Sequence, residues 1–396
     1  MPMKLRWGYS LVLLPFLGQA ITFNELTNRA SEVSEELIES NGRMNAIGFE
    51  KASALAGEPL SIETSARNIR ADNTNDSGKE YGIMLDYAFK LPSFKSAKAN
   101  EFDVQKKETE HEIAARKALI QVALKRGWLL YQLEYQRSLI LSEKRDFSYK
   151  AYQIGEKKFK AGRLSQMELL RLENEYQSTL QELAAVSMEA EHAQHYLKGA
   201  LMSDQEVMVD DLNFAFISSS ALEERLKNAP LLKSLDLRID AYNAQIATQR
   251  HSTIESISVG VGITQEPTQN SLDVRLSIPL SISSKNENKI AALMSERSAL
   301  VNLREVSRQK LELSVKGLFE HLREREENIK KLAENEKKYE TLFTMAQKGY
   351  DGGVIGQFEY LASKNAYYEA RLRTLKMKQN YIEEMSVIEE KIGEVW

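Results

Sequence analysis

The chain has 396 residues with only 7 Pro and 19 Gly, which is too few loop-forming residues for a loop-rich globular enzyme of this length. A formal net charge of −4 argues against a nucleic-acid-binding surface. The absence of cysteine excludes disulfides, thiol catalysis and lipidation of an N-terminal cysteine. The composition therefore favours long, uninterrupted elements.

Residues 1–20 have the pattern of a secretory signal peptide. Lys4 and Arg6 precede an apolar run over residues 11–17, and residues 18–20 (Gly-Gln-Ala) offer a small-x-small cleavage site. The apolar run is too short to span a membrane as a helix. We expect the mature chain to begin near Ile21.

The pattern of the first half predicts a helical segment, then a hairpin of two strands, and then a longer hairpin of two helices. Residues 23–57 have helical periodicity, interrupted at Asn41-Gly42. Apolar and polar residues alternate over strands at about 60–70 and 81–91, joined by a polar turn. An unbroken helical pattern follows from about residue 96 to 159, with coiled-coil spacing, and a tip at about 159–166 leads into a return helix ending near residue 199.

The second half repeats this plan. Helices are expected at 222–228 and 230–251, strands at about 255–264 and 271–280, a long helix at 286–348, a tip at about 350–357 and a last helix to the end. A shift of 191 positions carries Gly162 onto Gly353 and also aligns the second strands of the two hairpins. We therefore divide the chain into a signal peptide (1–20), a first repeat (21–202), an inter-repeat segment (203–220) and a second repeat (221–396).

The predicted strands suit an outer membrane. Each is about ten residues long and, when tilted, spans an apolar band about 25 Å tall. Four strands cannot close a barrel, and open edges are not tolerated in lipid, so more than one chain must contribute; three chains would give twelve strands. A soluble sheet edge is the alternative, disfavoured because no other strands are available to cover the apolar face. Polar residues predicted to face the interior are Glu63, Arg67, Asp86, Lys90, Asp273 and Arg275, and those predicted to face lipid are Tyr81, Ile83, Leu85, Tyr87, Phe89, Leu272, Val274, Leu276, Ile278 and Leu280.

Both hairpins start from helices and return to helices, which places every helix on one side of the membrane. The predicted fold class is therefore mainly α with a small membrane β portion. Duplicated long helical hairpins form a helical barrel, with the tips about 95 Å from the strands at 1.5 Å per residue.

Over nearly its whole mature length the sequence resembles the TolC-like outer membrane efflux family. The resemblance rests on the duplicated plan and on three motifs: Phe159-x-x-Gly162 followed by Glu168-x-Leu170, Tyr350-x-x-Gly353 followed by Glu359-x-Leu361, and Ile278-Pro279-Leu280. Residues 57–68, Lys79-Glu80-Tyr81 and Lys90-Leu91-Pro92 are similar to the heavy-metal (cobalt, zinc, cadmium or copper) branch. The chain departs from the family in lacking a lipidation cysteine and in placing Pro92 after Leu91.

The resemblance implies a trimer in the cell outer membrane, with a twelve-stranded barrel and a periplasmic α-helical barrel. It also implies docking to a periplasmic adaptor protein and an inner-membrane pump, which together form a tripartite efflux system for metal ions or small toxic compounds. The channel would be passive, without cofactors or enzymatic activity. Two alternatives remain: a type I protein secretion conduit, and a soluble periplasmic coiled-coil adaptor or scaffold.

Candidate site residues lie at the two tips. By position in the family, Glu168 and Glu359 are candidates for acidic rings at the periplasmic gate, and the competing interpretation is that they are acids favoured at a helix start. Candidates for adaptor contact are Gly162, Arg163, Leu164, Gly353, Val354 and Ile355.

No catalytic, cofactor or metal site is predicted. His192 and His195 lie one turn apart with Glu189 and Glu191 nearby, but the pattern lacks a third ligand of fixed geometry. We interpret these four side chains as a charged helix surface.

Overall fold

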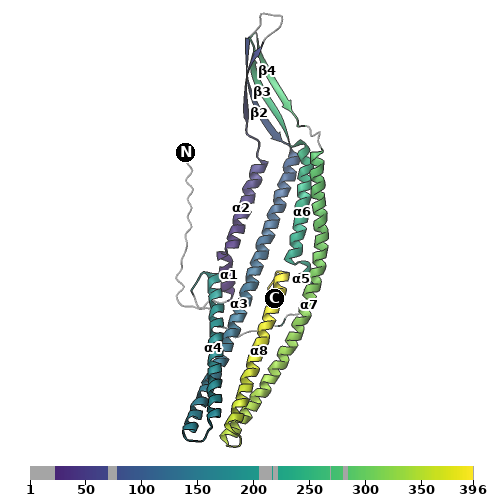
Figure 1. Cartoon of the computed structure of the whole chain (residues 1–396). Helices are drawn as coiled ribbons and strands as arrows, with labels where there is room; N and C mark the ends of the chain where they lie inside the picture. The colour runs from purple at the N-terminus through teal and green to yellow at the C-terminus, as the bar shows by residue number, and fades with distance from the viewer. Residues whose placement is uncertain are drawn as a thin grey trace.

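The computed structural model is a long rod with the strands at one end and the helix tips at the other (Figure 1). It describes residues 23–69, 78–204, 216, 222–267, 269–279 and 284–395. The predicted signal peptide, most of the inter-repeat segment and the lipid-facing candidate Leu280 lie outside the described residues. The predicted combination of long helices and four strands is confirmed.

The first helical segment breaks at a different place from the one predicted. Helices α1 (Phe23–Val33) and α2 (Glu35–Leu55) meet at Ser34, whose backbone is extended, with φ −66° and ψ 118°. The Ser34 carbonyl accepts the backbone N–H groups of Leu37 and Ile38, which starts α2. The interruption predicted at Asn41-Gly42 is wrong, because a single exposed glycine lowers helix propensity by only about 1 kcal/mol and α2 continues through it.

The strands form one antiparallel sheet in the order β1-β2-β3-β4. They are β1 (Ser61–Ile69), β2 (Gly78–Lys90), β3 (Ser256–Gln265) and β4 (Asn270–Ser277). The last strand was expected to extend to residue 280, but it ends at Ser277, shortly before Pro279. Proline has no N–H to donate to a sheet, so Ile278 lies beyond the end of the strand.

Four long helices form the two hairpins. They are α3 (Pro92–Lys160) with α4 (Gln166–Leu201), and α7 (Lys285–Asp351) with α8 (Gln357–Ile392). The shift of 191 positions carries both ends of α4 onto both ends of α8. At 1.5 Å per residue, the 69 residues of α3 extend about 100 Å. The remaining helical pieces are α5 (Leu222–Lys227), α6 (Pro230–His251) and the 3-10 turn η2 (Ser252–Ile254).

The helices pack as one layer rather than as a closed bundle. Near the tips their order is α4, α3, α8 and α7, and nearer the sheet it is α2, α3, α6 and α7. The layer therefore has free edges at α7 on one side and at α4 and α2 on the other (Figure 1).

Three apolar clusters hold the layer together. One cluster joins α5, α6, α7 and α8 around Val315 and Ile388, and a second joins α1, α3 and α4 around Leu124 and Leu197. The third includes Leu133 of α3 and Ile382 of α8, and it joins the two repeats. Burial of large aliphatic side chains contributes roughly 1.5–3 kcal/mol each, so these contacts fix the relative position of the hairpins.

Candidate channel surfaces: the sheet and the helix tips

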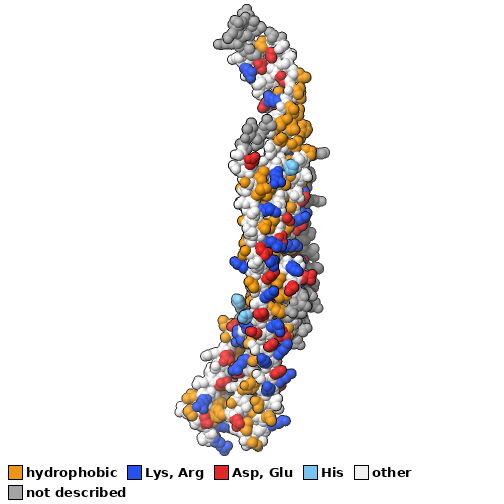
Figure 2. Space-filling view, turned by 90° about the vertical axis from the view of Figure 1, so that its right-hand side faces the viewer, with side chains coloured by type: hydrophobic (Ala, Val, Ile, Leu, Met, Phe, Trp, Pro, Cys, Tyr) orange, Lys and Arg blue, Asp and Glu red, His pale blue; other side chains and the backbone are white. Residues whose placement is uncertain are grey.

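One face of the sheet is a continuous apolar surface. The register aligns Ile62, Leu85, Val261 and Val274 across the four strands, and the next rows above and below are also mainly apolar. Figure 2 shows hydrophobic side chains gathered along one side of the strand end. Of the predicted lipid-facing residues, Tyr81, Ile83, Leu85, Phe89, Leu272, Val274, Leu276 and Ile278 are exposed, with Val274 at 72%, and Tyr87 is half-buried.

The opposite face is polar and carries glycine where the strands need room. Arg275 of β4 donates from Nη1 to Glu63 Oε2 of β1 at 2.9 Å, and the same nitrogen lies 3.9 Å from Asp86 Oδ2. Gly260 lies between Asp86 and Arg275 in the register. A Cβ on Gly260 would lie 2.1 Å from Asp86 Oδ1, so a side chain here would displace Asp86. This face therefore carries charged side chains and glycines rather than an apolar core.

The sheet has two open edges. Strands β1 and β4 each pair with one neighbour only within the described chain. In a hydrocarbon environment each unpaired N–H or C=O group costs several kcal/mol, so these edges require strands from other chains.

The two helix tips turn in the same way. Gly162 and Gly353 adopt φ of +68° and +71°, a left-handed conformation that costs other residues about 1–2 kcal/mol. Gly162 N–H donates to Phe159 O at 2.9 Å, and Gly353 N–H donates to Tyr350 O at 3.0 Å. Both glycines are needed for the turn, whatever else they contact.

The other four tip candidates divide into inward and outward pairs. Leu164 and Ile355 are half-buried, and they pack beside Gly155 and Gly349 of the preceding helix. By contrast, Arg163 is exposed and Val354 is 82% exposed. Of these four side chains, Arg163 and Val354 are therefore the two that are more available to a partner.

The two gate candidates differ in their surroundings. Glu168 forms a capping box: its Oε2 accepts Ser165 N–H at 2.9 Å, while its own N–H donates to Ser165 Oγ at 3.2 Å. These hydrogen bonds from Ser165 hold the pKa of Glu168 below its ordinary value. Glu359 follows Gly356, which offers no side-chain cap. Only Glu359 has a carboxylate without a capping role, and it lines a groove between α7 and α8.

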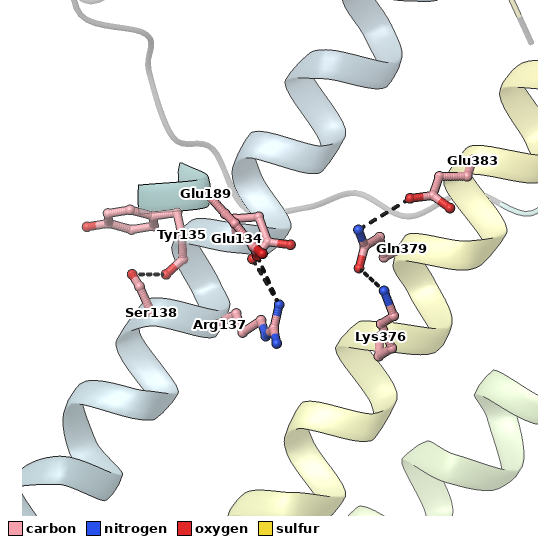
Figure 3. A network of polar contacts seen from close by, with 8 residues as sticks. All are labelled: Glu134, Tyr135, Arg137, Ser138, Glu189, Lys376, Gln379 and Glu383. Atoms are coloured by element: carbon pink, nitrogen blue, oxygen red, sulfur yellow. Dashed lines mark hydrogen bonds and ion pairs between the residues drawn. The ribbon is translucent and has the colours of Figure 1, made fainter. Parts of the chain in front are cut away.

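An acid near the histidine pair is engaged by an arginine of the neighbouring helix. Glu189, the nearby acid, lies 3.3 Å from Arg137 Nη1, and the same nitrogen lies 3.4 Å from Glu134 of α3 (Figure 3). Within the described ranges there is no group of three or more potential metal ligands. Burial, opposed by Arg137 and reinforced by Glu189, raises the pKa of the Glu134 carboxyl.

Because the pKa of Glu134 is raised, we expect its replacement to stabilise the folded protein by an amount that depends on pH. An acid with a raised pKa in the folded state stabilises the fold below its ordinary value of 4.5, and this contribution is lost as pH rises through the folded pKa. Glu134→Gln should therefore raise the melting temperature of detergent-solubilised protein more at pH 7 than at pH 4. Glu191→Gln, at an exposed position of α4, should give no such difference. An equal rise in melting temperature at both pH values would contradict the raised pKa assigned to Glu134.

The polar contacts between the two hairpins could not be predicted from the residue pattern. Lys144 of α3 is nearly buried, and its Nζ lies 3.1 Å from Glu369 Oε1 of α8 and 3.5 Å from Glu182 Oε2 of α4. Burial opposes its charge, but the two carboxylates outweigh burial and raise the pKa of Lys144. A lysine within a coiled-coil pattern carries no sequence signal of such a partner.

The fold and its surfaces define a class of protein. No described helix is both long and apolar enough to cross a bilayer. A four-stranded sheet that is apolar on one face, charged on the other and open at both edges, carried on long duplicated hairpins, is the architecture of a membrane channel protein.

Residues 221–393 match the sequence profile of the family described as outer membrane efflux protein. The match covers the second repeat, and the first repeat has the same strand, helix and tip plan. This confirms the resemblance predicted from the motifs, and with it a transport rather than an enzymatic role. Curated protein sequences include no significant match to the chain.

Solved structures share the fold over nearly the whole chain. CusC, described in terms of transmembrane channel formation, is 16% identical, with 96% of each chain covered and a TM-score of 0.75. The outer-membrane channel OprN is 14% identical over 94% of this chain and 90% of its own, with a TM-score of 0.74. The Campylobacter jejuni outer membrane channel CmeC is 13% identical over 97% and 90%, with a TM-score of 0.74. At these identities the similarity concerns the fold.

Proposed function

We propose that the protein is the outer membrane channel of a tripartite efflux system. The observation that supports this most is the exposed apolar face of a sheet with two open edges, since it needs both lipid and further strands. Three copies would pool twelve strands into a water-filled barrel, with the charged face inside. The helices would then line a passive conduit through the periplasm for metal ions or small toxic compounds.

The partners in this proposal meet the chain at the tips. A periplasmic adaptor would contact the exposed side chains Arg163 and Val354 around the turns at Gly162 and Gly353, with Leu164 and Ile355 shaping the turns beneath. An inner-membrane pump would supply both energy and choice of cargo. The similarity of residues 57–68 to the heavy-metal branch favours metal ions as cargo, and the metal sensitivity of a deletion strain tests it.

Fractionation distinguishes this function from a periplasmic adaptor or scaffold. We expect the protein in the outer membrane fraction, released only by detergent, and conducting in planar bilayers. Recovery from the periplasm without detergent would exclude the channel. The export of a protein rather than small compounds by the intact system would instead favour a type I secretion conduit.

We predict that Glu359→Gln changes cation conductance more than Glu168→Gln does. In an oligomer each acid forms a ring of carboxylates at the tip, which attracts cations. The Glu168 carboxylate is held by Ser165, while that of Glu359 has no capping partner. Planar-bilayer recordings across pH test this, with Glu156→Gln near the first tip as a control. Unchanged conductance and cation block in both variants would remove these residues from the gate.

A further inference from the structure

Three acids and one arginine share the middle of the polar face of the sheet, and we call them the sheet charge group. They come from β1, β2 and β4 and are Glu63, Asp86, Asp273 and Arg275. In the register Asp86 and Arg275 lie in one row, and Glu63 and Asp273 lie in the next row of the same face. Such rows are two residues apart, about 7 Å, so the four charges lie at nearly one level of the sheet.

The arginine of this group crosses the sheet surface from one edge strand to the other. Arg275 of β4 donates from Nη1 to Glu63 Oε2 of β1 at 2.9 Å, although three strand spacings, about 14 Å in a flat sheet, separate these two strands. The strand β3 contributes Gly260 and Gly262 to the two rows, so it has no side chain in the way. The guanidinium is therefore held close to the sheet, beside the carboxylates of other strands.

Asp86 depends on the same arginine. Its side chain occupies the space above Gly260, where an added Cβ would lie 2.1 Å from Asp86 Oδ1. The Asp86 side chain is only 15% exposed, and within the described ranges its Oδ2 accepts no hydrogen bond. This oxygen lies 3.9 Å from Arg275 Nη1. One guanidinium nitrogen thus serves as countercharge both for a largely buried carboxylate and for Glu63, whose side chain is 63% exposed.

The third acid has a neutral partner. Asp273 Oδ2 accepts a hydrogen bond from Thr264 Oγ1 of β3. Arg275 is thus the only cation of the sheet charge group, and its three carboxylates leave a net charge of −2 in each chain. Without the guanidinium this net charge would be −3. The arginine therefore determines how much acidic charge this level of the polar face presents.

We propose that Arg275 sets the ion selectivity of the barrel interior by neutralising part of the acidic charge of Glu63 and Asp86. The proposal rests on the proposed function, in which the polar face lines the pore and the sheet charge group repeats around it in every copy. Charged rings in a pore select ions by sign, and substitutions on the lumen side of a barrel tune that selectivity. The barrel then prefers cations at a second level, at the far end of the molecule from the tip acids (Figure 1).

Reversal potentials of the full-length protein in planar bilayers, measured under a potassium chloride gradient, test this role. We expect Arg275→Gln to raise the permeability ratio of K⁺ to Cl⁻ roughly twofold, because one carboxylate per copy loses its countercharge. Glu63→Gln should lower the same ratio. Arg275→Lys keeps the positive charge and should retain the ratio of the wild-type channel.

A double variant separates the effect of charge from a distortion of the sheet. Arg275→Gln combined with Glu63→Gln returns the net charge of the group to −2, so the permeability ratio should return toward that of the wild-type channel. A second substitution would not repair a distorted sheet. Recordings are compared between variants that form the detergent-resistant oligomer, and if Arg275→Gln alone did not assemble, Glu63→Gln and the double variant would carry the test.

Two outcomes would overturn the role of Arg275. One is a conducting Arg275→Gln or Glu63→Gln channel whose K⁺ to Cl⁻ ratio equals that of the wild-type protein. The other is a changed ratio in Arg275→Gln that persists in the double variant. Both results would leave the channel function standing, whereas a wild-type protein that neither enters bilayers nor conducts would remove the function itself.

Discussion

Val274→Arg is expected to abolish stable insertion of the protein into the outer membrane. Val274 is 72% exposed and lies in the apolar row with Ile62, Leu85 and Val261. An arginine at mid-depth on the lipid face of a barrel costs about 2–4 kcal/mol, and every copy in the oligomer would carry it. The variant should lose its detergent-resistant oligomer and accumulate outside the outer membrane fraction.

A control on the same strand separates the lipid face from a general effect of charge. Ser277 lies on the face that carries Arg275, because alternate residues of a strand point to the same side. Ser277→Arg should therefore assemble like the wild-type protein. Equal membrane insertion of the Val274 and Ser277 variants would contradict the assignment of the two faces.

The strands and tips could be predicted because their signals are local. A period of two fixes which residues share a sheet face, and the observed register brings the two predicted hairpins together with their apolar faces on the same side. The tips could be predicted because Gly162 and Gly353 each interrupt a helical pattern. In the structure both glycines adopt a positive φ. Duplication strengthened both signals, since each occurs twice at the same spacing.

The contacts between hairpins could not be predicted in the same way. Helical periodicity shows which face of α3 is apolar, but it does not show which helix covers that face. Lys144 and Glu369 are 225 residues apart, and only the tertiary packing brings them together. The role of Glu168 was likewise open, because an acid three residues after a serine suits either a capping box or a charged ring.

Lys125→Met is expected to destabilise the helical body by roughly 3–5 kcal/mol. Lys125 Nζ of α3 lies 2.7 Å from Glu389 Oε1 of α8, and the Glu389 side chain is 1% exposed. Removing the ammonium group leaves a buried carboxylate without this countercharge, which costs far more than the loss of a surface pair. Thermal unfolding followed by circular dichroism in detergent should show a clearly lower melting temperature.

A double variant at Lys125 and Glu389 identifies the cause of the destabilisation. Lys125→Met combined with Glu389→Leu replaces both charges by apolar groups of similar size, and it should recover most of the lost stability. Arg126→Met breaks the neighbouring but exposed pair with Glu390, at 3.4 Å, and should have little effect. If the double variant were as unstable as Lys125→Met alone, lost packing rather than the loss of this countercharge would explain the destabilisation. Gly393, directly after the end of α8, leaves no room for a side chain against Pro230 at the start of α6, so this buried pair lies close to the level at which α8 is followed by α6 beside α3.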